Sequence, residues 1–110
     1  MSTPEIEAIV DRGGDADDVL RAVVEALAAR YGWAGIFFVE EQALVLGPEA
    51  GTPNEPARTN VPVRFNGDRI AELGVDNAPG EDRSSLERVA ELVAGHCLVG
   101  WDTGGEDWEP

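Results

Sequence analysis

The first apolar positions of the chain recur at the spacing of a helix. Ile6, Ile9 and Val10 share one helical face, and the Thr-Pro pair just before them suits a helix start. Glycines at positions 13 and 14 end the pattern, because glycine commonly stands just beyond a helix C-terminus. The pattern predicts a short amphipathic helix over 4–11.

A second and longer helical pattern follows. Its apolar residues repeat at three- and four-residue intervals; they are Leu20, Val23, Val24, Leu27 and Tyr31. Alanines between them favour a helix, and Gly32 stands where a C-terminal glycine is expected. We predict a helix over 17–31.

At position 33 the pattern changes to that of strands. The segment 33–39 is apolar on both faces and rich in aromatic and β-branched residues, which is typical of a central strand covered on both sides. A polar turn leads to a second strand over 43–46, its predicted hairpin partner. Three prolines and two glycines in the segment 47–60 predict a loop.

Two further strands, over 61–65 and 70–75, flank an Asn-Gly turn, and the proline at position 62 favours an edge strand. A three-residue loop pairs Phe65 with Arg69, whereas a two-residue loop pairs Phe65 with Asp68. Cross-strand partners share a face, so the three-residue loop keeps the apolar side chains together and is the predicted register. Its pairs are Phe65 with Arg69, Val63 with Ala71, and Val61 with Leu73.

A helix over 84–99 completes the pattern. Ser84 and Glu87 have the spacing of a capping box, and the apolar face consists of Leu86, Val89, Ala90, Val93 and Cys97. Helices at both ends of an antiparallel meander indicate an α+β domain. We expect one domain over 1–101, followed by an acidic, tryptophan-containing tail over 102–110.

The charge of the chain excludes several partners. The 22 acidic residues outnumber 8 basic residues, all arginine, which gives a net charge of −14. Such a field repels the phosphates of nucleic acids and of anionic membranes, so we expect neither partner. The first residues lack a basic stretch before an apolar run, and no apolar run reaches the length of a membrane span. We expect a cytoplasmic protein.

Three stretches in the second half of the chain carry a resemblance: 61–63 (VPV), 70–75 (IAELGV) and 86–94 (LERVAELVA). They resemble the closing half of GAF domains, where a Val-Pro strand leads through a turn to a second strand and a terminal helix. The helix and strand predicted before them resemble the GAF opening, so the resemblance spans about residues 15–100. It implies a GAF-like, PAS-related α+β fold, with N- and C-terminal helices packed on one face of an antiparallel sheet.

The resemblance also implies a set of functions. GAF domains bind cyclic nucleotides, tetrapyrroles, haem or small metabolites, and many act only in dimerisation. Their segment after the second strand is usually long and closes over the ligand, whereas here only 47–60 occupies that place. The resemblance therefore implies a pocket that is reduced or absent.

The residues offer little for a cofactor. The Asn-Lys pattern of cyclic-nucleotide sites is absent, and His96-Cys97 reverses the Cys-His order of bilin-binding members. A single histidine does not complete a typical metal site. We expect no metal and no cofactor. We interpret Cys97 as a small buried hydrophobic residue and His96 as a partly buried or capping residue near the helix end.

Catalytic chemistry finds equally little support. Free methionine sulfoxide reductases are GAF domains, and Gly47-Pro48 resembles the start of their Gly-Pro-Phe segment. That chemistry needs a nucleophilic thiol and a resolving thiol, but the chain has one cysteine. No nucleophile elbow is present either. We predict no catalytic residues and expect a protein that is not an enzyme.

The sheet face away from the helices is the candidate ligand site. Large apolar side chains of the central strand reach it, and the alternation of the second hairpin places Arg64 near Glu72, diagonally close enough to pair. Alternation also assigns Ile70 to this face. The candidate ligand-binding residues are Phe37, Val39, Arg58, Arg64 and Glu72. The loop over 47–60, the tail through Trp101 or Trp108, a ligand or a partner chain could cover this face.

Two functions remain open. The first is a non-enzymatic GAF-like module for regulation or assembly, as a homodimer through the helices over 4–11, 17–31 and 84–99. This hypothesis is based on the amphipathic first helix, whose apolar face needs a packing partner. The alternative is a small-molecule sensor that binds its ligand on the sheet face.

Overall fold

The computed structural model describes residues 4–101, with side chains described for residues 4–97. In chain order its elements are α1 (Pro4–Arg12), α2 (Ala16–Tyr31), β1 (Trp33–Glu40), β2 (Ala43–Gly51), the 3-10 turn η1 (Glu55–Ala57), β3 (Arg58–Phe65), β4 (Asp68–Asp76), the 3-10 turn η2 (Gly80–Asp82) and α3 (Arg83–Trp101). The predicted tail over 102–110 and the side chain of Trp101 lie outside the described residues.

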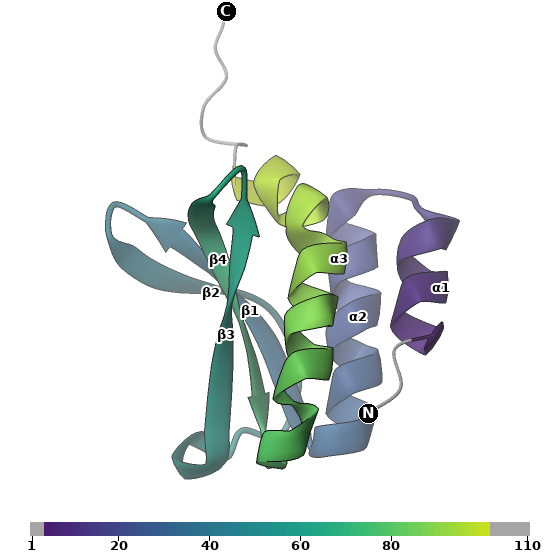
Figure 1. Ribbon diagram of the computed structural model, residues 1–110, viewed down its shortest axis with the longest axis vertical. Helices are drawn as coiled ribbons and strands as arrows, with labels where there is room; N and C mark the ends of the chain where they lie inside the picture. Colours follow the sequence, from purple (N-terminus) through teal and green to yellow (C-terminus); the bar gives the residue numbers. More distant parts are fainter. Residues whose placement is uncertain (1–3, 102–110) are drawn as a thin grey trace, which may run out of the picture.

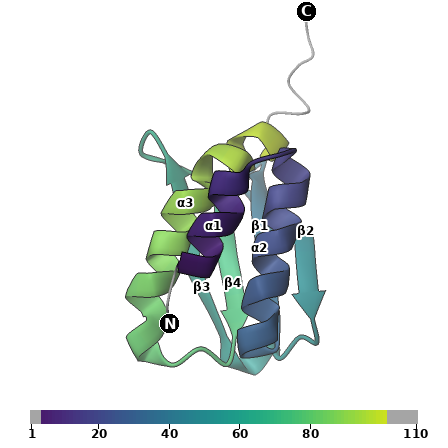
Figure 2. The ribbon, with the colours of Figure 1, turned by 90° about the vertical axis from the view of Figure 1, so that its right-hand side faces the viewer.

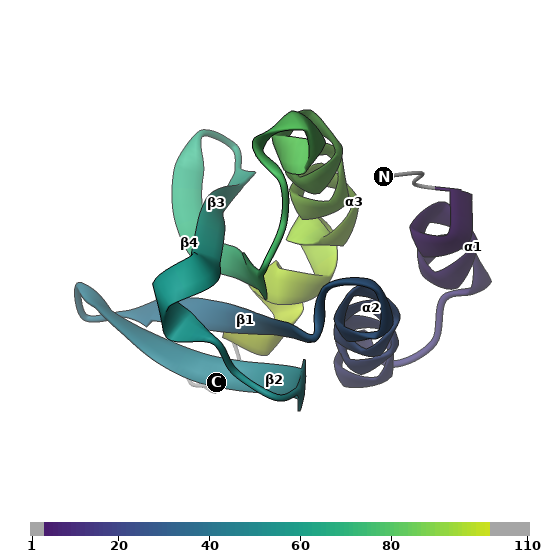
Figure 3. The ribbon, with the colours of Figure 1, turned by 90° about the horizontal axis from the view of Figure 1, so that it is seen from below.

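The strands form one antiparallel sheet in the order β2-β1-β4-β3, so β1 and β4 are central and β2 and β3 are edges. Helices α2 and α3 cover one face of this sheet (Figure 1). Helix α1 lies on the outer side of α2 and α3, as Figures 2 and 3 show. The predicted α+β arrangement, with an antiparallel sheet and terminal helices on one face, is confirmed. The predicted meander is wrong, because β1 pairs with β4 and places β2 at an edge.

The core lies between the sheet and the helices α2 and α3. Val23 and Val24 of α2, and Val89 and Val93 of α3, are fully buried against the inward-facing side chains of the sheet. Ile6 and Ile9 of α1 are also buried, at 2% and 8% exposure. The apolar face of α1 therefore packs within the chain.

The helix boundaries follow the predicted signals closely. Helix α1 ends one residue later than predicted and α2 begins one residue earlier. Gly32 has φ of 97°, a conformation that favours glycine, and its N–H donates to the carbonyl oxygen of Ala28 at 2.7 Å. The glycine stop of α2 is confirmed.

The predicted loop over 47–60 is mostly wrong. Strand β2 continues to Gly51 and β3 begins at Arg58. The register of β1 with β2 shifts at Gly47-Pro48, which places both residues in a bulge on an edge strand. A proline is tolerated at a bulge, and a Cβ on Gly47 would lie 2.3 Å from the Phe38 ring. These residues mark an irregular strand instead of a loop.

The second hairpin combines both registers considered from sequence. Val63 pairs with Ala71, as predicted, but Phe65 pairs with Asp68, so the predicted pairing of Phe65 with Arg69 is wrong. A bulge between Val63 and Arg64 reconciles the two-residue turn with the apolar register. The same bulge turns Ile70 into the core, at 5% exposure, and corrects its predicted place on the open face.

The start of α3 differs from the predicted capping box. The helix begins at Arg83, so Ser84 lies inside it, and the Glu87 carboxylate accepts from Arg83 Nε at 3.2 Å. Just before the helix, Asp82 accepts from the Tyr31 hydroxyl at 2.7 Å. Burial, and then this hydrogen bond, raise the pKa of Tyr31 to about 12. The bond joins the end of α2 to the start of α3.

Candidate functional site

The sheet face opposite the helices is lined by alternate residues of each strand. Phe37 of β1 is the register partner of Glu72 of β4, and Pro62 of β3 is also paired with Glu72. Register partners share a face, so these three side chains project from the same side. The two ends of this face, near Trp33 and near the β1–β2 turn, are built differently.

At the first end the indole of Trp33 fills the face. Trp33 is 1% exposed. A Cβ built on Gly35 would lie 2.6 Å from the Trp33 ring, so the ring rests directly on this glycine. Gly74 of β4 lies beside the same ring, and Trp33 Nε1 donates to Glu49 Oε1 at 3.0 Å. Two strand glycines thus make room for one large side chain.

Arg58 covers the exposed side of this indole. Its guanidinium carbon lies 3.8 Å from the centroid of the Trp33 ring, which is a close cation–π contact. The Asp76 carboxylate accepts from Arg58 Nε at 2.7 Å and from Nη2 at 3.1 Å. We call Trp33, Arg58 and Asp76, with Gly35 and Gly74 beneath, the tryptophan plug.

The electrostatics of the plug follow from its burial. Asp76 is fully buried, and it also accepts from the backbone N–H of Asn54. The hydrogen bonds from Arg58, and then from Asn54, lower the pKa of Asp76 despite its burial. The same pairing raises the pKa of Arg58 above its ordinary value. Both groups are therefore held in their charged forms.

The connection between β2 and β3 is tied down beside the plug. Asn54 Nδ2 donates to Asn77 Oδ1 at 2.8 Å, and Asn77 Nδ2 donates to the carbonyl oxygen of Tyr31 at 2.7 Å. The N–H of Thr52 donates to the carbonyl oxygen of Gly32 at 2.8 Å. These bonds hold the connection that precedes Arg58 against the end of α2.

The second end of the face is open and apolar. Leu44 pairs with Val39 and Leu46 pairs with Phe37, so Leu44 and Leu46 lie on the open face, while Val45 faces the other side. Leu44, Val45 and Leu46 are 42%, 44% and 41% exposed. In Figure 1 the tip of the β1–β2 hairpin extends away from the helical layer. We call Leu44, Val45 and Leu46 the hairpin patch.

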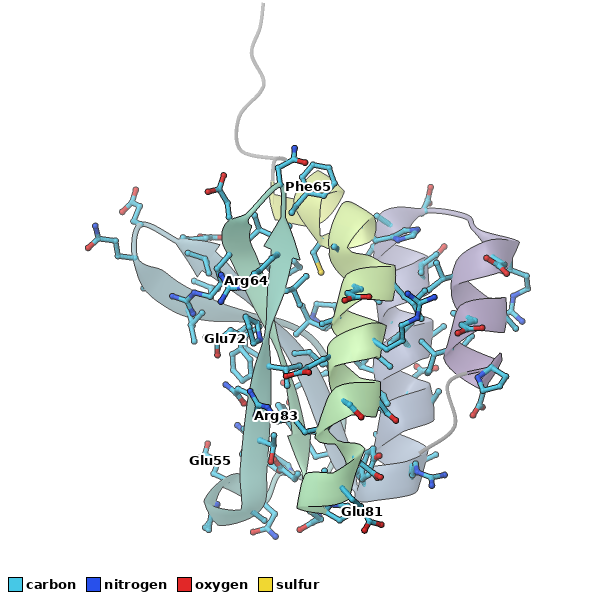
Figure 4. All side chains as sticks on the ribbon, viewed as in Figure 1. Glu55, Arg64, Phe65, Glu72, Glu81 and Arg83 are labelled. Atoms are coloured by element: carbon cyan, nitrogen blue, oxygen red, sulfur yellow. The ribbon has the colours of Figure 1, made fainter. Side chains whose placement is uncertain are left out.

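The predicted ion pair of Arg64 with Glu72 is wrong. Glu72 forms an ion pair with Arg69 and accepts from Asn60 Nδ2 at 2.9 Å. Arg64 instead lines a groove of about 420 Å³ between β3 and α3. The other lining residues are Pro62, Arg83, Glu87, Ala90 and Glu91. Figure 4 shows Arg64 near the Phe65 end of β3 and Arg83 near the start of α3.

The structure therefore places the predicted ligand-binding residues at different parts of the surface and does not bring them together in one site. Phe37 and Glu72 face each other across β1 and β4, Val39 lies toward the hairpin patch, and Arg58 lies on Trp33. Sequence reasoning missed Trp33 and Asp76 as parts of this surface. The available signal was a tryptophan two residues before a strand glycine, because a side chain at the glycine would have competed for the same face.

Cys97 lies on the core-facing side of α3, and the plug lies on the other face of the sheet. It is fully buried, and burial raises its pKa to about 12. Its interpretation as a small buried hydrophobic residue is confirmed, and His96 is half-buried as expected. Across residues 4–97, no three His, Cys, Asp or Glu side chains cluster as metal ligands would. None of the helices within 4–101 combines the length and the apolar character needed to cross a bilayer.

Two solved structures resemble this arrangement. The first is the GAF domain of phosphoenolpyruvate-protein phosphotransferase from Acinetobacter, with a TM-score of 0.73, 15% identity and coverage of 94% of each chain. The second is a type II free methionine-R-sulfoxide reductase from Thermoplasma acidophilum, with a TM-score of 0.65 and 18% identity, covering 83% of this chain and 96% of that chain. No protein-family model and no curated protein sequence matches. The chain has a GAF-like fold.

Proposed function

We propose that this protein is a non-enzymatic GAF-like module for regulation or assembly, with a ligand pocket reduced by its own side chains. The observation that carries the proposal is the tryptophan plug. Trp33 is 1% exposed beneath the Arg58 guanidinium, 3.8 Å away, and that guanidinium is held by the buried Asp76. A ligand at this end of the sheet would have to displace a buried ring and break a buried ion pair, which is costly.

The cysteine chemistry supports a module without thiol catalysis. A thiolate is the nucleophile in disulfide exchange and in thiol-based reduction, so a reactive cysteine needs exposure and a low pKa. Cys97 is the one cysteine of the chain, and its burial raises its pKa to about 12. The similarity to a methionine sulfoxide reductase therefore supports a common fold and does not extend to the thiol mechanism.

The location of exposed apolar side chains favours assembly through the sheet. Among the described residues, the large apolar side chains with substantial exposure are those of the hairpin patch. The outer helix faces carry charged residues such as Glu25 and Arg88. Ile6 and Ile9 of α1 are buried within the chain, so the apolar face of this helix does not need a second copy to cover it. The argument from sequence for a helical homodimer therefore loses its support. That homodimer stays a prediction.

Native mass spectrometry of protein purified directly from its host tests the proposal. We expect the mass of the bare polypeptide, because the plug occupies the sheet face. In parallel, reduction of free methionine sulfoxide by the wild type and by Cys97→Ser should not exceed the protein-free rate. Arg64→Ala, at an exposed position outside the plug, serves as the matched surface control for Phe37→Ala.

Two outcomes would overturn the proposal. A small molecule that copurifies with the wild type and is lost from Phe37→Ala, but kept by Arg64→Ala, would establish the sensor function instead. Turnover of methionine sulfoxide that disappears in Cys97→Ser would establish an enzyme. Either result is independent of any partner protein.

A further inference from the structure

The outer edge of β2 exposes backbone groups as well as apolar side chains. Glu40 and Ala43 close a two-residue turn, in which Glu41 and Gln42 have φ of 50° and 72°. The residues that close such a turn form a hydrogen-bonded pair, and the antiparallel ladder then alternates. The N–H and C=O groups of Leu44 and Leu46 therefore point away from β1, toward the open edge.

The segment 43–46 of this edge lacks the usual protection against strand pairing. Natural edge strands are commonly blunted by charges, prolines or bulges. The other edge strand of this sheet, β3, carries Pro62 and Arg64. In contrast, the β2 segment 43–46 has no charged residue, and its bulge at Gly47-Pro48 lies beyond the exposed leucines. The two edges of one sheet therefore differ in their readiness to accept a strand.

The acidic residues around the segment 43–46 indicate which kind of strand could pair with this edge. Glu40 and Glu41 stand at the turn end of the segment 43–46, and Glu49 stands beyond its other end. A second copy paired antiparallel on β2 would bring Glu41 of one chain toward Glu49 of the other. Each copy also has a net charge of −14, so self-pairing is opposed locally and globally. A strand with basic ends is attracted instead.

We propose that the outer edge of β2 binds an extended segment of another protein as an added strand. That segment carries apolar residues at alternate positions, which contact Leu44 and Leu46, and Lys or Arg at its ends, which face Glu40, Glu41 and Glu49. Backbone hydrogen bonds supply affinity, and the side chains and charges supply selectivity. The inference rests on the proposed function, because it names the partner class of the assembly module.

A random twelve-residue peptide library displayed on phage and selected on the immobilised full-length protein tests the inference. We expect enriched peptides with alternating apolar residues and basic ends. Their affinity, measured by isothermal titration with synthetic copies, should fall at least tenfold on Leu44→Pro. Proline removes an N–H that the protein itself does not use there, and an edge position tolerates it. The matched control is Arg64→Ala on the other edge.

Two further variants keep the test decisive if Leu44→Pro impairs folding. Glu40→Gln with Glu41→Gln should weaken binding of the same peptides and reduce its dependence on salt, because two charges near the basic ends are lost. Leu46→Ser should weaken binding through the lost apolar contact. Circular dichroism and the thermal midpoint establish that each variant is folded.

Three results would overturn the inference. One is the absence of enriched peptides with this pattern. Another is enriched peptides whose affinity is unchanged in both Leu46→Ser and the double glutamine variant. The last is a wild-type dimer, seen by sedimentation, that dissociates in Leu44→Pro, because the occupant of the edge is then a second copy. None of these results bears on the bare mass or the absent turnover that test the proposed function.

Discussion

The two ends of the open sheet face both include residues of the β1–β2 hairpin, but one end is buried and the other is exposed. At one end, Trp33 is buried beneath Arg58, which is held by Asp76. At the other end, Leu44 and Leu46 remain more than two-fifths exposed. Both ends are apolar in sequence, so hydrophobicity does not distinguish them. The neighbours of the two ends differ. Glycines and an ion pair surround Trp33, whereas the hairpin patch lies on an edge strand, where Leu44 and Leu46 face away from the helices.

The comparison teaches that one end of the face serves stability and the other is available for binding. A side chain that is buried against its own chain contributes to folding in proportion to its buried apolar area. An exposed apolar patch contributes little to folding and commonly marks an interaction surface. Substitutions at the two ends should therefore separate into those that affect unfolding and those that affect association.

The largest expected effect follows replacement of Trp33. Trp33→Ala should lower the free energy of unfolding by about 4 kcal/mol, because it leaves a cavity above Gly35 and removes the surface on which Arg58 lies. Leu46→Ala should change the same quantity by no more than about 0.5 kcal/mol. Guanidinium denaturation followed by circular dichroism measures both. Equal losses for the two variants would contradict the difference between the ends.

A somewhat smaller effect is expected at Asp76. Asp76→Ala should lower the free energy of unfolding by about 3 kcal/mol at neutral pH, since it leaves the Arg58 guanidinium unpaired at 17% exposure. The pKa of Asp76 is lowered in the folded protein, so the ionised carboxylate stabilises the fold above its ordinary pKa of 3.8. This contribution is lost as the pH falls through the lowered pKa.

The difference in stability between the wild type and Asp76→Ala should therefore shrink as the pH falls below about 4, where carboxylates begin to protonate. Urea titrations between neutral pH and about pH 2 would follow it. Asp68→Ala, at the exposed start of β4, is the control and should show no comparable difference. A difference that stays constant across this range would show that Asp76 acts through its shape and not its charge.

The smallest effect is expected from salt. Added sodium chloride should raise the thermal midpoint of the wild type, because screening weakens the mutual repulsion behind a net charge of −14. Screening acts mainly on exposed charges, so the loss caused by Asp76→Ala should change little. A midpoint that does not move between about 0.05 and 1 M salt, over which the screening length shortens several-fold, would contradict this expectation.

Local patterns in the sequence were sufficient for much of the fold. The helical spacing of apolar residues, the glycine after Tyr31 and the dense apolar run from Trp33 led to the correct elements. The pairing of Val63 with Ala71 also followed, because the burial of one face specifies the register. The predicted candidate site was only partly assembled, since Arg64 lines a separate groove and Glu72 pairs with Arg69.

The errors share a physical cause. Gly47-Pro48 was interpreted as loop because glycine and proline lower strand propensity, but a bulge on an edge strand accommodates both. The bulge at Val63-Arg64 moved Ile70 to the core in the same way. A bulge changes the face of every following side chain, and its place depends on the neighbouring strand and not on local pattern.

The sequence by itself determined the layers of this protein, the helices and central strand, and the absence of a second thiol, because these depend on local periodicity and on composition. Only the tertiary structure decided that Trp33, Arg58 and Asp76 meet, since they come from three strands and converge through sheet register. It also decided that the described residues leave the hairpin patch exposed, because the patch lies on an edge strand and Leu44 and Leu46 face away from the helices.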